Sequence, residues 1–167
     1  KFEKFQKLFI IEELNKKLKE LFNCDVMVFG EAYGGKCQGM SQTYGKELKF
    51  IVFDVQVGDL WLDVPKAEEI ANKLGLEFVS YHKIFTDLNS IDAERDLPSV
   101  QAVRNGCGND KLREGIVLRP LIEVIKNNSC RIISKHKREE FMETNTPREV
   151  NLEQLQVLSD ARLIAEE

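Results

Sequence analysis

The segment that most constrains the fold is an extended run at 48–55, Leu-Lys-Phe-Ile-Val-Phe-Asp-Val, followed by a turn and a second apolar run at 60–62. Aromatic and β-branched residues favour strands. The Gly58-Asp59 pair between the two runs predicts a tight hairpin, which joins antiparallel strands. Further strands are predicted at 26–29, 78–81, about 115–119 and 130–137. Few helices separate these strands, so the pattern predicts an α+β fold with mostly antiparallel sheets.

Helical periodicity is strongest at the N-terminus, where apolar residues recur at helical spacing across 2–22. This spacing predicts an amphipathic helix that packs its apolar stripe on the rest of the protein. A second helix is predicted at 66–74, because Pro65 favours a first helical turn and Gly75 a C-terminal cap. A short helix is predicted at about 98–105 and a final helix at 151–167, whereas the rest of 86–113 is predicted to be loop. The pattern at 121–128 predicts no particular structure.

The composition is typical of a soluble globular protein, with 167 residues, of which 31% are charged and 43% hydrophobic. A net charge of −4 gives no global basic field, so any nucleic-acid contact requires a local basic patch. The densest candidate patch consists of Arg131, Lys135, Lys137 and Arg138. The four cysteines form no Cys-x-x-Cys pair, so free thiols are expected rather than a zinc site. No apolar run reaches the roughly 20 residues of a membrane span, so no membrane partner is expected.

Two lysines at the end of the predicted strand at 130–137 form the first candidate site. Side chains alternate between the two faces of a strand, so Lys135 and Lys137 point the same way. Two ammonium groups on one face repel each other unless an anion lies between them, and phosphate is the commonest strong anion in a cell. A solvated edge strand is the alternative, because lysines at an edge deter pairing with other strands. Glu114 could hold a lysine or a metal ion beside that phosphate.

Four segments occur in order along the chain: Phe-Gly-Glu-Ala-Tyr-Gly-Gly at 29–35, Phe-Ile-Val-Phe-Asp-Val at 50–55, Glu-Gly-Ile-Val-Leu-Arg-Pro at 114–120 and Ser-Lys-His-Lys at 134–137. Together they resemble the motifs of the covalent nucleotidyltransferases, the superfamily of polynucleotide ligases and capping enzymes. Within it, the chain is most similar to the RNA ligase 2 family, which includes the T-even phage nick-sealing enzyme and the kinetoplastid RNA-editing ligases. The resemblance spans roughly residues 25–141. It implies antiparallel sheets that form a nucleotide cleft, in the ATP-grasp-like ligase fold.

The resemblance also implies roles for five residues. Glu31 matches the glutamate that holds the ribose hydroxyls, with a simple turn residue as the alternative. Phe53 matches the aromatic ring that stacks on adenine, with a core phenylalanine as the alternative. Glu114 matches the carboxylate that acts near the metal and the nucleophilic lysine, and Lys135 and Lys137 match the pair that contacts the α-phosphate. The implied cofactors are ATP, as AMP donor, and Mg²⁺, with Glu114 as its candidate ligand.

The chain departs from the family pattern in two places. Arg119 stands where the family usually has lysine, and strict alternation puts it on the strand face opposite Glu114. The family's nucleophile is a lysine in Lys-x-Asp-Gly, upstream of the Gly-Glu motif, and no such tetrapeptide occurs here. The first explanation is an N-terminally incomplete domain, and the second is a relative without this lysine. Residues 1–150 are thus predicted to be a partial adenylyltransferase domain, and 151–167 a C-terminal helix or the start of a further domain.

The resemblance implies an ATP-dependent RNA ligase. Such an enzyme takes AMP from ATP onto a lysine, passes it to a 5′-phosphate RNA end and seals that end to a 3′-hydroxyl. RNA ends or a nicked duplex would be its partners, as in RNA repair, and an intracellular location is expected, in the cytoplasm or an organelle. The alternatives are a DNA ligase, a guanylyl-transferring capping enzyme, and a non-catalytic module that binds nucleotides or RNA ends.

Overall fold

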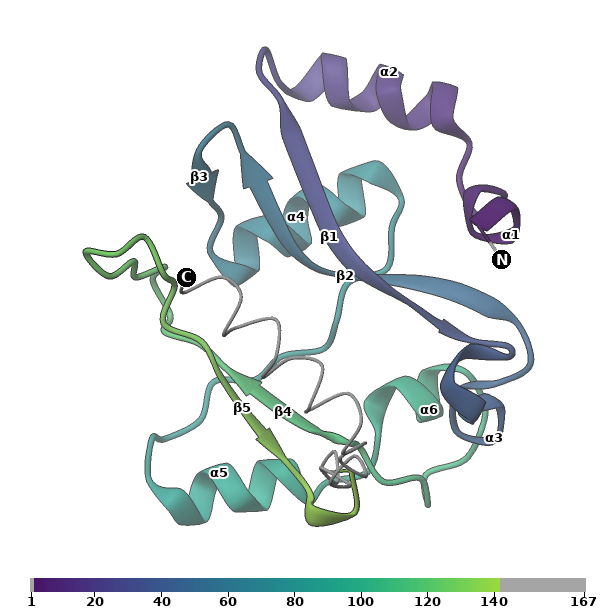
Figure 1. The fold of residues 1–167 in the computed structure, drawn as a ribbon, viewed down its shortest axis with the longest axis vertical. Helices are drawn as coiled ribbons and strands as arrows, with labels where there is room; N and C mark the ends of the chain where they lie inside the picture. The colour runs from purple at the N-terminus through teal and green to yellow at the C-terminus, as the bar shows by residue number, and fades with distance from the viewer. Residues whose placement is uncertain (1, 142–167) are drawn as a thin grey trace, which may run out of the picture.

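Two antiparallel sheets form the framework of the protein in the computed structural model, which describes residues 2–141 (Figure 1). The larger sheet contains β1 (Val26–Gly34), β2 (Leu48–Val57) and β3 (Leu60–Trp61), in the order β1-β2-β3. The smaller sheet is a hairpin that pairs β4 (Gly115–Leu118) with β5 (Ser134–Lys137). This mixture of helices and antiparallel sheets confirms the predicted α+β class.

The helices cover the two sheets separately. Helix α4 packs on β2 of the larger sheet and α2 packs beside α4, whereas α5 lies against the β4–β5 hairpin (Figure 1). Within residues 2–141 no helix is both long and apolar enough to cross a membrane. The α-helices of this part of the chain are α1 (Phe2–Gln6), α2 (Ile11–Leu21), α3 (Ser41–Tyr44), α4 (Val64–Leu74), α5 (Leu88–Arg95) and α6 (Val100–Arg104), with 3-10 turns at Cys37–Gly39 and Glu139–Phe141.

The hydrophobic core lies between β2 and α4. Val52 and Val55 of β2 are completely buried, and they pack against the apolar side of α4 and against Phe78. Apolar side chains from α2 extend the same core, which explains the apolar stripe in the N-terminal sequence. The core residues contributed by α4 are Ala67, Ile70, Ala71 and Leu74.

A β-bulge in β2 decides which side chains face this core. Phe29 pairs with Asp54 but Gly30 pairs with Val52, so the pairing skips Phe53. The extra residue reverses the alternation of faces along the strand. Val52 and Val55 can therefore both face α4 although they lie three positions apart. Asp54 is left on the opposite face, where it meets the β4–β5 hairpin.

The central hairpin and the α4 helix agree with their sequence signals. Val57 pairs with Leu60 across the predicted Gly58-Asp59 turn. Pro65 lies in the first turn of α4, and Gly75 ends the helix in the left-handed conformation, with φ of 79°. The predicted helix at 98–105 is also present, as α6, where the Ser99 side chain caps the helix by accepting from Ala102 N.

The single N-terminal helix predicted over 2–22 is wrong, because the structure has two helices, α1 and α2, with a break between them. The rings of Phe5 and Phe9 both contact Phe50 of β2, at centroid distances of 5.7 and 5.2 Å. Leu14 and Leu18 of α2 instead pack against the main core. The apolar residues of α1 and of α2 thus pack at two separate places on the protein. These tertiary contacts override the helical propensity of the residues between the two helices.

Other differences concern strands and loops. β1 continues through Gly34, so Glu31 lies within a strand and not in the predicted turn. The prediction of loop before Pro98 missed α5, whose Asp87 cap accepts from Ser90 N at 2.9 Å. The predicted strand at 78–81 is reduced to one bridge between Phe78 and Val52. β5 contains only the last four residues of the predicted 130–137 strand. The helix predicted at 151–167 falls outside the described residues.

Candidate functional site

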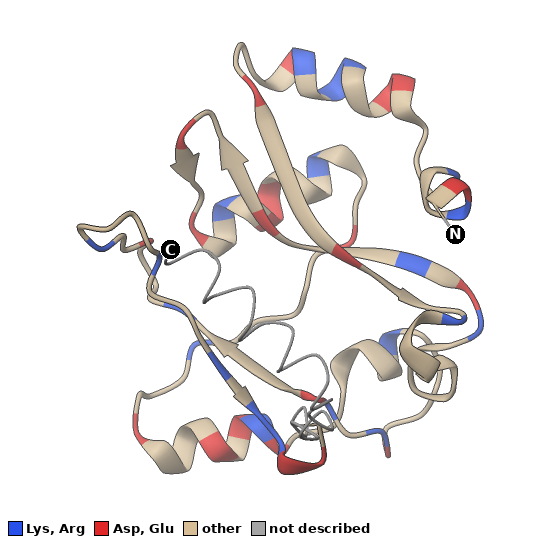
Figure 2. Cartoon of the chain, in the orientation of Figure 1, with Lys and Arg blue, Asp and Glu red and all other residues tan. Residues whose placement is uncertain are grey.

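Lys135 and Lys137 share one face of the β4–β5 hairpin, as strand alternation predicts. Lys135 pairs with Val117 and Lys137 pairs with Gly115. His136 points to the opposite face, where its Nε2 lies 2.7 Å from Asp92 Oδ1 of α5. Helix α5 therefore covers the histidine face, and the lysines lie on the other one. Figure 2 shows the basic residues of β5 beside α5, which carries acidic residues.

Gly115 explains the local form of the Glu-Gly motif. A Cβ atom at this position would lie 2.4 Å from the His136 carbonyl oxygen and 2.7 Å from Lys137 Cα. These are backbone atoms that cannot move aside, so a side chain would push the two strands apart. The Arg138 N–H closes the hairpin by donating to the Glu114 carbonyl at 2.9 Å. Glycine thus keeps Glu114 at the end of the hairpin that also carries Lys137.

Glu31 and Glu114 come from different sheets, and both act on the half-buried phenol of Tyr44. Burial raises the pKa of Tyr44, and the negative charges of Glu114 and Glu31 raise that pKa further. A hydrogen bond with the Ser99 side chain acts in the opposite direction. The charges of the two predicted carboxylates therefore act on the same phenol.

Tyr44 was not among the predicted site residues, since it lies in a segment that the sequence marks only as a glycine-containing loop. In the structure, Tyr44 is the last residue of α3, and contacts from other elements fix its position. Its ring meets the ring of Tyr33 edge to face at 5.8 Å, and its carbonyl accepts from Asn105 Nδ2 at 3.0 Å. Asn105 Oδ1 in turn accepts from Lys49 Nζ at 2.9 Å. β1, β2, α3 and the end of α6 thus fix the position of Tyr44.

Phe53 is not part of the hydrophobic core. Its side chain is 43% exposed, whereas its neighbours Val52 and Asp54 are buried. The bulge accounts for this difference, because it removes Phe53 from the regular alternation of β2. An exposed phenylalanine next to a fixed sheet leaves one aromatic surface accessible to a planar partner.

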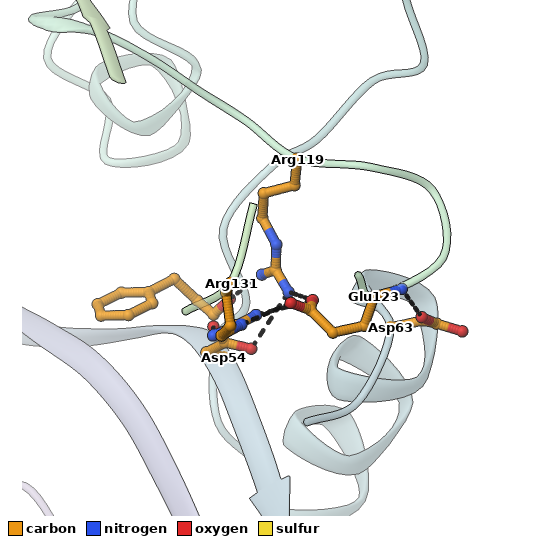
Figure 3. Close-up of polar contacts among 6 residues, drawn as sticks. Asp54, Asp63, Arg119, Glu123 and Arg131 are labelled. Atoms are coloured by element: carbon orange, nitrogen blue, oxygen red, sulfur yellow. Dashed lines mark hydrogen bonds and ion pairs between the residues drawn. The ribbon is translucent and has the colours of Figure 1, made fainter. Parts of the chain in front are cut away.

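A buried ionic cluster joins the β4–β5 hairpin to the larger sheet (Figure 3). Arg131, just before β5, donates to Asp54 of β2 and binds both carboxylate oxygens of Glu123, at 2.6 and 2.9 Å. Arg119, just after β4, donates to Glu123 at 2.8 Å and lies 3.4 Å from Asp54 Oδ1. The side chains are 5% exposed for Asp54, 9% for Glu123, and 12% for each arginine. We refer to these four residues as the ionic cluster.

The charges within the ionic cluster stabilise one another. The hydrogen bonds from Arg131 lower the pKa of Glu123 below its ordinary value. The carboxylates of Glu123 and Asp54 in turn raise the pKa of Arg131. The guanidinium of Arg131 also lies over the Trp61 ring, 3.9 Å from its centroid. The cluster therefore has balanced charges, two positive and two negative. A cation–π contact with Trp61 adds to its stability.

Two of the four members of the predicted basic patch at 131–138 pair with carboxylates. Arg131 belongs to the ionic cluster, and Arg138 NH1 lies 3.4 Å from Asp96. Arg119, the counterpart of a family lysine, is likewise paired inside the cluster. Sequence reasoning missed Glu123, which lies in the unassigned segment 121–128. An acidic residue between two arginines was the available signal.

A depression on the surface lies apart from these residues. This shallow depression beside α5 is lined by Lys83, Phe85 and Leu97 among others, and none of its lining residues is a predicted site residue or a member of the ionic cluster. Among residues 2–141, no group of three or more histidine, cysteine, aspartate or glutamate side chains is arranged to hold a metal ion.

The sequence model of a family described as RNA ligase matches residues 2–137, which include both sheets and all five predicted site residues. A search of the curated proteins found no sequence that matches the chain.

Proposed function

We propose that this chain, which belongs to the RNA ligase family, is the adenylyltransferase part of an ATP-dependent RNA ligase. The family match confirms the resemblance predicted from the four sequence motifs. In the proposed reaction, AMP passes from ATP to a lysine, then to the 5′-phosphate of an RNA end, and leaves when that end is joined to a 3′-hydroxyl. RNA ends or a nicked duplex are the proposed substrates.

The observation that carries this proposal is the geometry of the hairpin, which places Lys135 and Lys137 on one face and Glu114 at the same end as Lys137. Glu31 of the larger sheet and Glu114 at the end of the hairpin both raise the pKa of the Tyr44 phenol. Two cations and a carboxylate on one hairpin suit the binding of a phosphate group together with its metal ion.

In our proposal the larger sheet binds the nucleoside. Glu31 accepts hydrogen bonds from the two ribose hydroxyls, a charge-assisted arrangement that favours vicinal O–H groups. The exposed ring of Phe53 stacks on adenine, a contact worth about 1–3 kcal/mol per base. Both residues have the exposure that these roles need.

The hairpin binds the phosphates. Lys135 and Lys137 contact the α-phosphate and stabilise the negative charge that develops there during transfer. Mg²⁺ usually takes one or two protein carboxylates and completes its ligands with water and phosphate oxygens. Glu114 fits this pattern as a single carboxylate, because it lies at the end of the hairpin that carries the two lysines. The bound ion would neutralise phosphate charge.

ATP binding tests this proposal. Calorimetric titration with ATP and Mg²⁺ should show one site, and Lys135→Ala or Lys137→Ala should weaken binding on the order of tenfold or more, as expected for charge-assisted contacts. Lys73→Ala is the matched control, since Lys73 is an exposed lysine that pairs with Glu69 on α4. The melting temperature of Lys135→Ala should stay close to that of the wild type, because Lys135 is exposed and exposed cations contribute little to stability. Early melting with unchanged ATP affinity would show that the lysines are structural.

A second candidate, a non-catalytic module that binds nucleotides or RNA ends, is favoured by one observation. None of the 167 residues form the Lys-x-Asp-Gly motif that carries the family's nucleophile. Incubation with radiolabelled ATP and Mg²⁺ should therefore give no acid-labile AMP adduct on this chain. If the chain becomes labelled efficiently, one of its own lysines is the nucleophile and the binding-module candidate is wrong.

A further inference from the structure

We propose that Arg131 is a positioning residue that sets where the phosphate-binding hairpin lies relative to the nucleoside-binding sheet. This inference rests on the proposed function, because it concerns the same nucleotide site. Arg131 touches neither proposed part of the nucleotide. It acts through the ionic cluster, which holds the hairpin against the face of β2 opposite α4 (Figure 3).

The first step in the argument is the position of Arg131 in the chain. It comes three residues before Ser134, the first residue of β5, and β5 carries both lysines. Its guanidinium reaches Asp54 of β2 and stacks over Trp61 of β3. A single side chain at the base of the lysine strand thus contacts two strands of the other sheet.

The second step is that the attachment is specific. Glu123 holds Arg131 by two parallel hydrogen bonds, a geometry that a planar guanidinium permits and an ammonium does not. The Glu123 backbone N–H donates to Asp63 Oδ1 at 2.8 Å, which ties the same loop to the start of α4. Buried ion pairs add little stability relative to apolar residues, but they tolerate few alternative arrangements. We infer that the ionic cluster fixes geometry more than it stabilises the fold.

The third step is the division of the proposed site between the two sheets. Glu31 and Phe53 belong to the larger sheet, whereas Glu114, Lys135 and Lys137 belong to the hairpin and its end. ATP would contact both parts, and adenosine would contact only the first. When two linked contacts are held at the correct separation, the second forms at a high effective concentration. Loosening the ionic cluster should therefore weaken the binding of ATP far more than that of adenosine.

The test compares Arg131→Gln and Arg131→Lys with the wild type. The dissociation constants of ATP with Mg²⁺ and of adenosine are measured by calorimetry for each protein. Arg131→Gln should raise the dissociation constant of ATP by about tenfold or more, through lost effective concentration, and change that of adenosine by less than about twofold. Arg131→Lys keeps the charge but not the forked hydrogen bonds, so its effect on ATP should be intermediate. Ile70→Val is the control, a core change on α4 that lowers stability without touching the ionic cluster.

Trp61 provides a separate reading of the same variants. It is the chain's only tryptophan, and Arg131 lies directly over its ring. Its emission spectrum should change in Arg131→Gln and remain unchanged in Ile70→Val. This change shows that the contact exists in solution, whether or not nucleotide is present. An unchanged spectrum in Arg131→Gln would overturn the proposal.

The binding outcomes separate the two proposals. If the wild type binds neither ATP nor adenosine, the proposed function fails, and the role of Arg131 fails with it. If the wild type binds both ligands and Arg131→Gln weakens them equally, the change has disturbed β2 or the fold in general, and Arg131 does not position the hairpin. Equal ATP affinity in Arg131→Gln and the wild type would overturn the inference on its own.

Discussion

At the scale of single residues, the absence of a side chain at Gly115 matters as much as the charges beside it. Gly115→Ala would bring a Cβ atom within 2.4 Å of the His136 carbonyl oxygen and force β4 away from β5. We expect this variant to lose about 1–3 kcal/mol of unfolding free energy, as is typical of overpacking. It should also bind ATP more weakly, because Glu114 and Lys137 would separate. Thermal unfolding and ATP titration check both effects, and a variant with wild-type values for both would contradict this account of the motif.

Single-residue roles differed in how far the sequence could predict them. The shared face of Lys135 and Lys137 follows from alternation, which needs only a regular strand. The exposure of Phe53 depends on a bulge, and a bulge is defined by pairing with β1. Tyr44 gives no local signal, because its neighbours Glu31 and Glu114 reach it from distant parts of the chain. The position of a side chain could be predicted where it depends only on the residue's own strand. It could not be predicted where it depends on pairing or contact with another part of the chain.

At the scale of elements, the ionic cluster should make the attachment of the hairpin sensitive to acid. Glu123 has a lowered pKa in the folded protein, mainly through its hydrogen bonds from Arg131. A lowered folded pKa means that the stabilisation is fully present above the unfolded value of about 4.3 and is lost as the pH falls through the folded value. Glu123→Gln should therefore melt earlier than the wild type near neutral pH.

The difference in melting temperature between Glu123→Gln and the wild type should shrink as the pH falls below about 4.3, where Glu123 becomes protonated in the unfolded chain, and should be lost once the pH passes the lower pKa of the folded protein. Melting curves of the two proteins between neutral and acidic pH measure this difference, and the other titrating groups cancel in the comparison. A difference that stays constant, or grows toward low pH, would contradict an ionised Glu123 in the cluster.

Elements with local start and stop signals were predicted well from the sequence. The Gly58-Asp59 turn and the Pro65 and Gly75 boundaries of α4 act through backbone conformation alone. The break between α1 and α2 carries no such signal, because it depends on where Phe5 and Phe9 find the ring of Phe50. Helix α5 was missed because its residues are mostly polar and their periodicity is weak.

At the scale of the whole molecule, the arrangement of the two sheets could not be predicted from residue patterns. The sequence indicates each sheet and the family resemblance implies a cleft, but their contact depends on Asp54, Glu123 and the two arginines. Asp54 lies 65 or more residues from the other three in the chain. In the sequence, all four look like ordinary surface charges, because only the fold buries them. The same contact removes Arg131 from the predicted nucleic-acid patch, so burial changes a functional prediction as well as a structural one.

The most direct measurement of the central claim is the map of ATP binding on the isotope-labelled chain, recorded by NMR as changes in backbone amide shifts. A nucleotide that binds across both sheets should shift the amides around Glu31 and Phe53 together with those of Gly115, Lys135 and Lys137. Adenosine should shift mainly the first group, because it lacks the phosphates that the hairpin would contact. Shifts confined to the depression beside α5, or no shifts at millimolar ATP, would contradict the proposed nucleotide site.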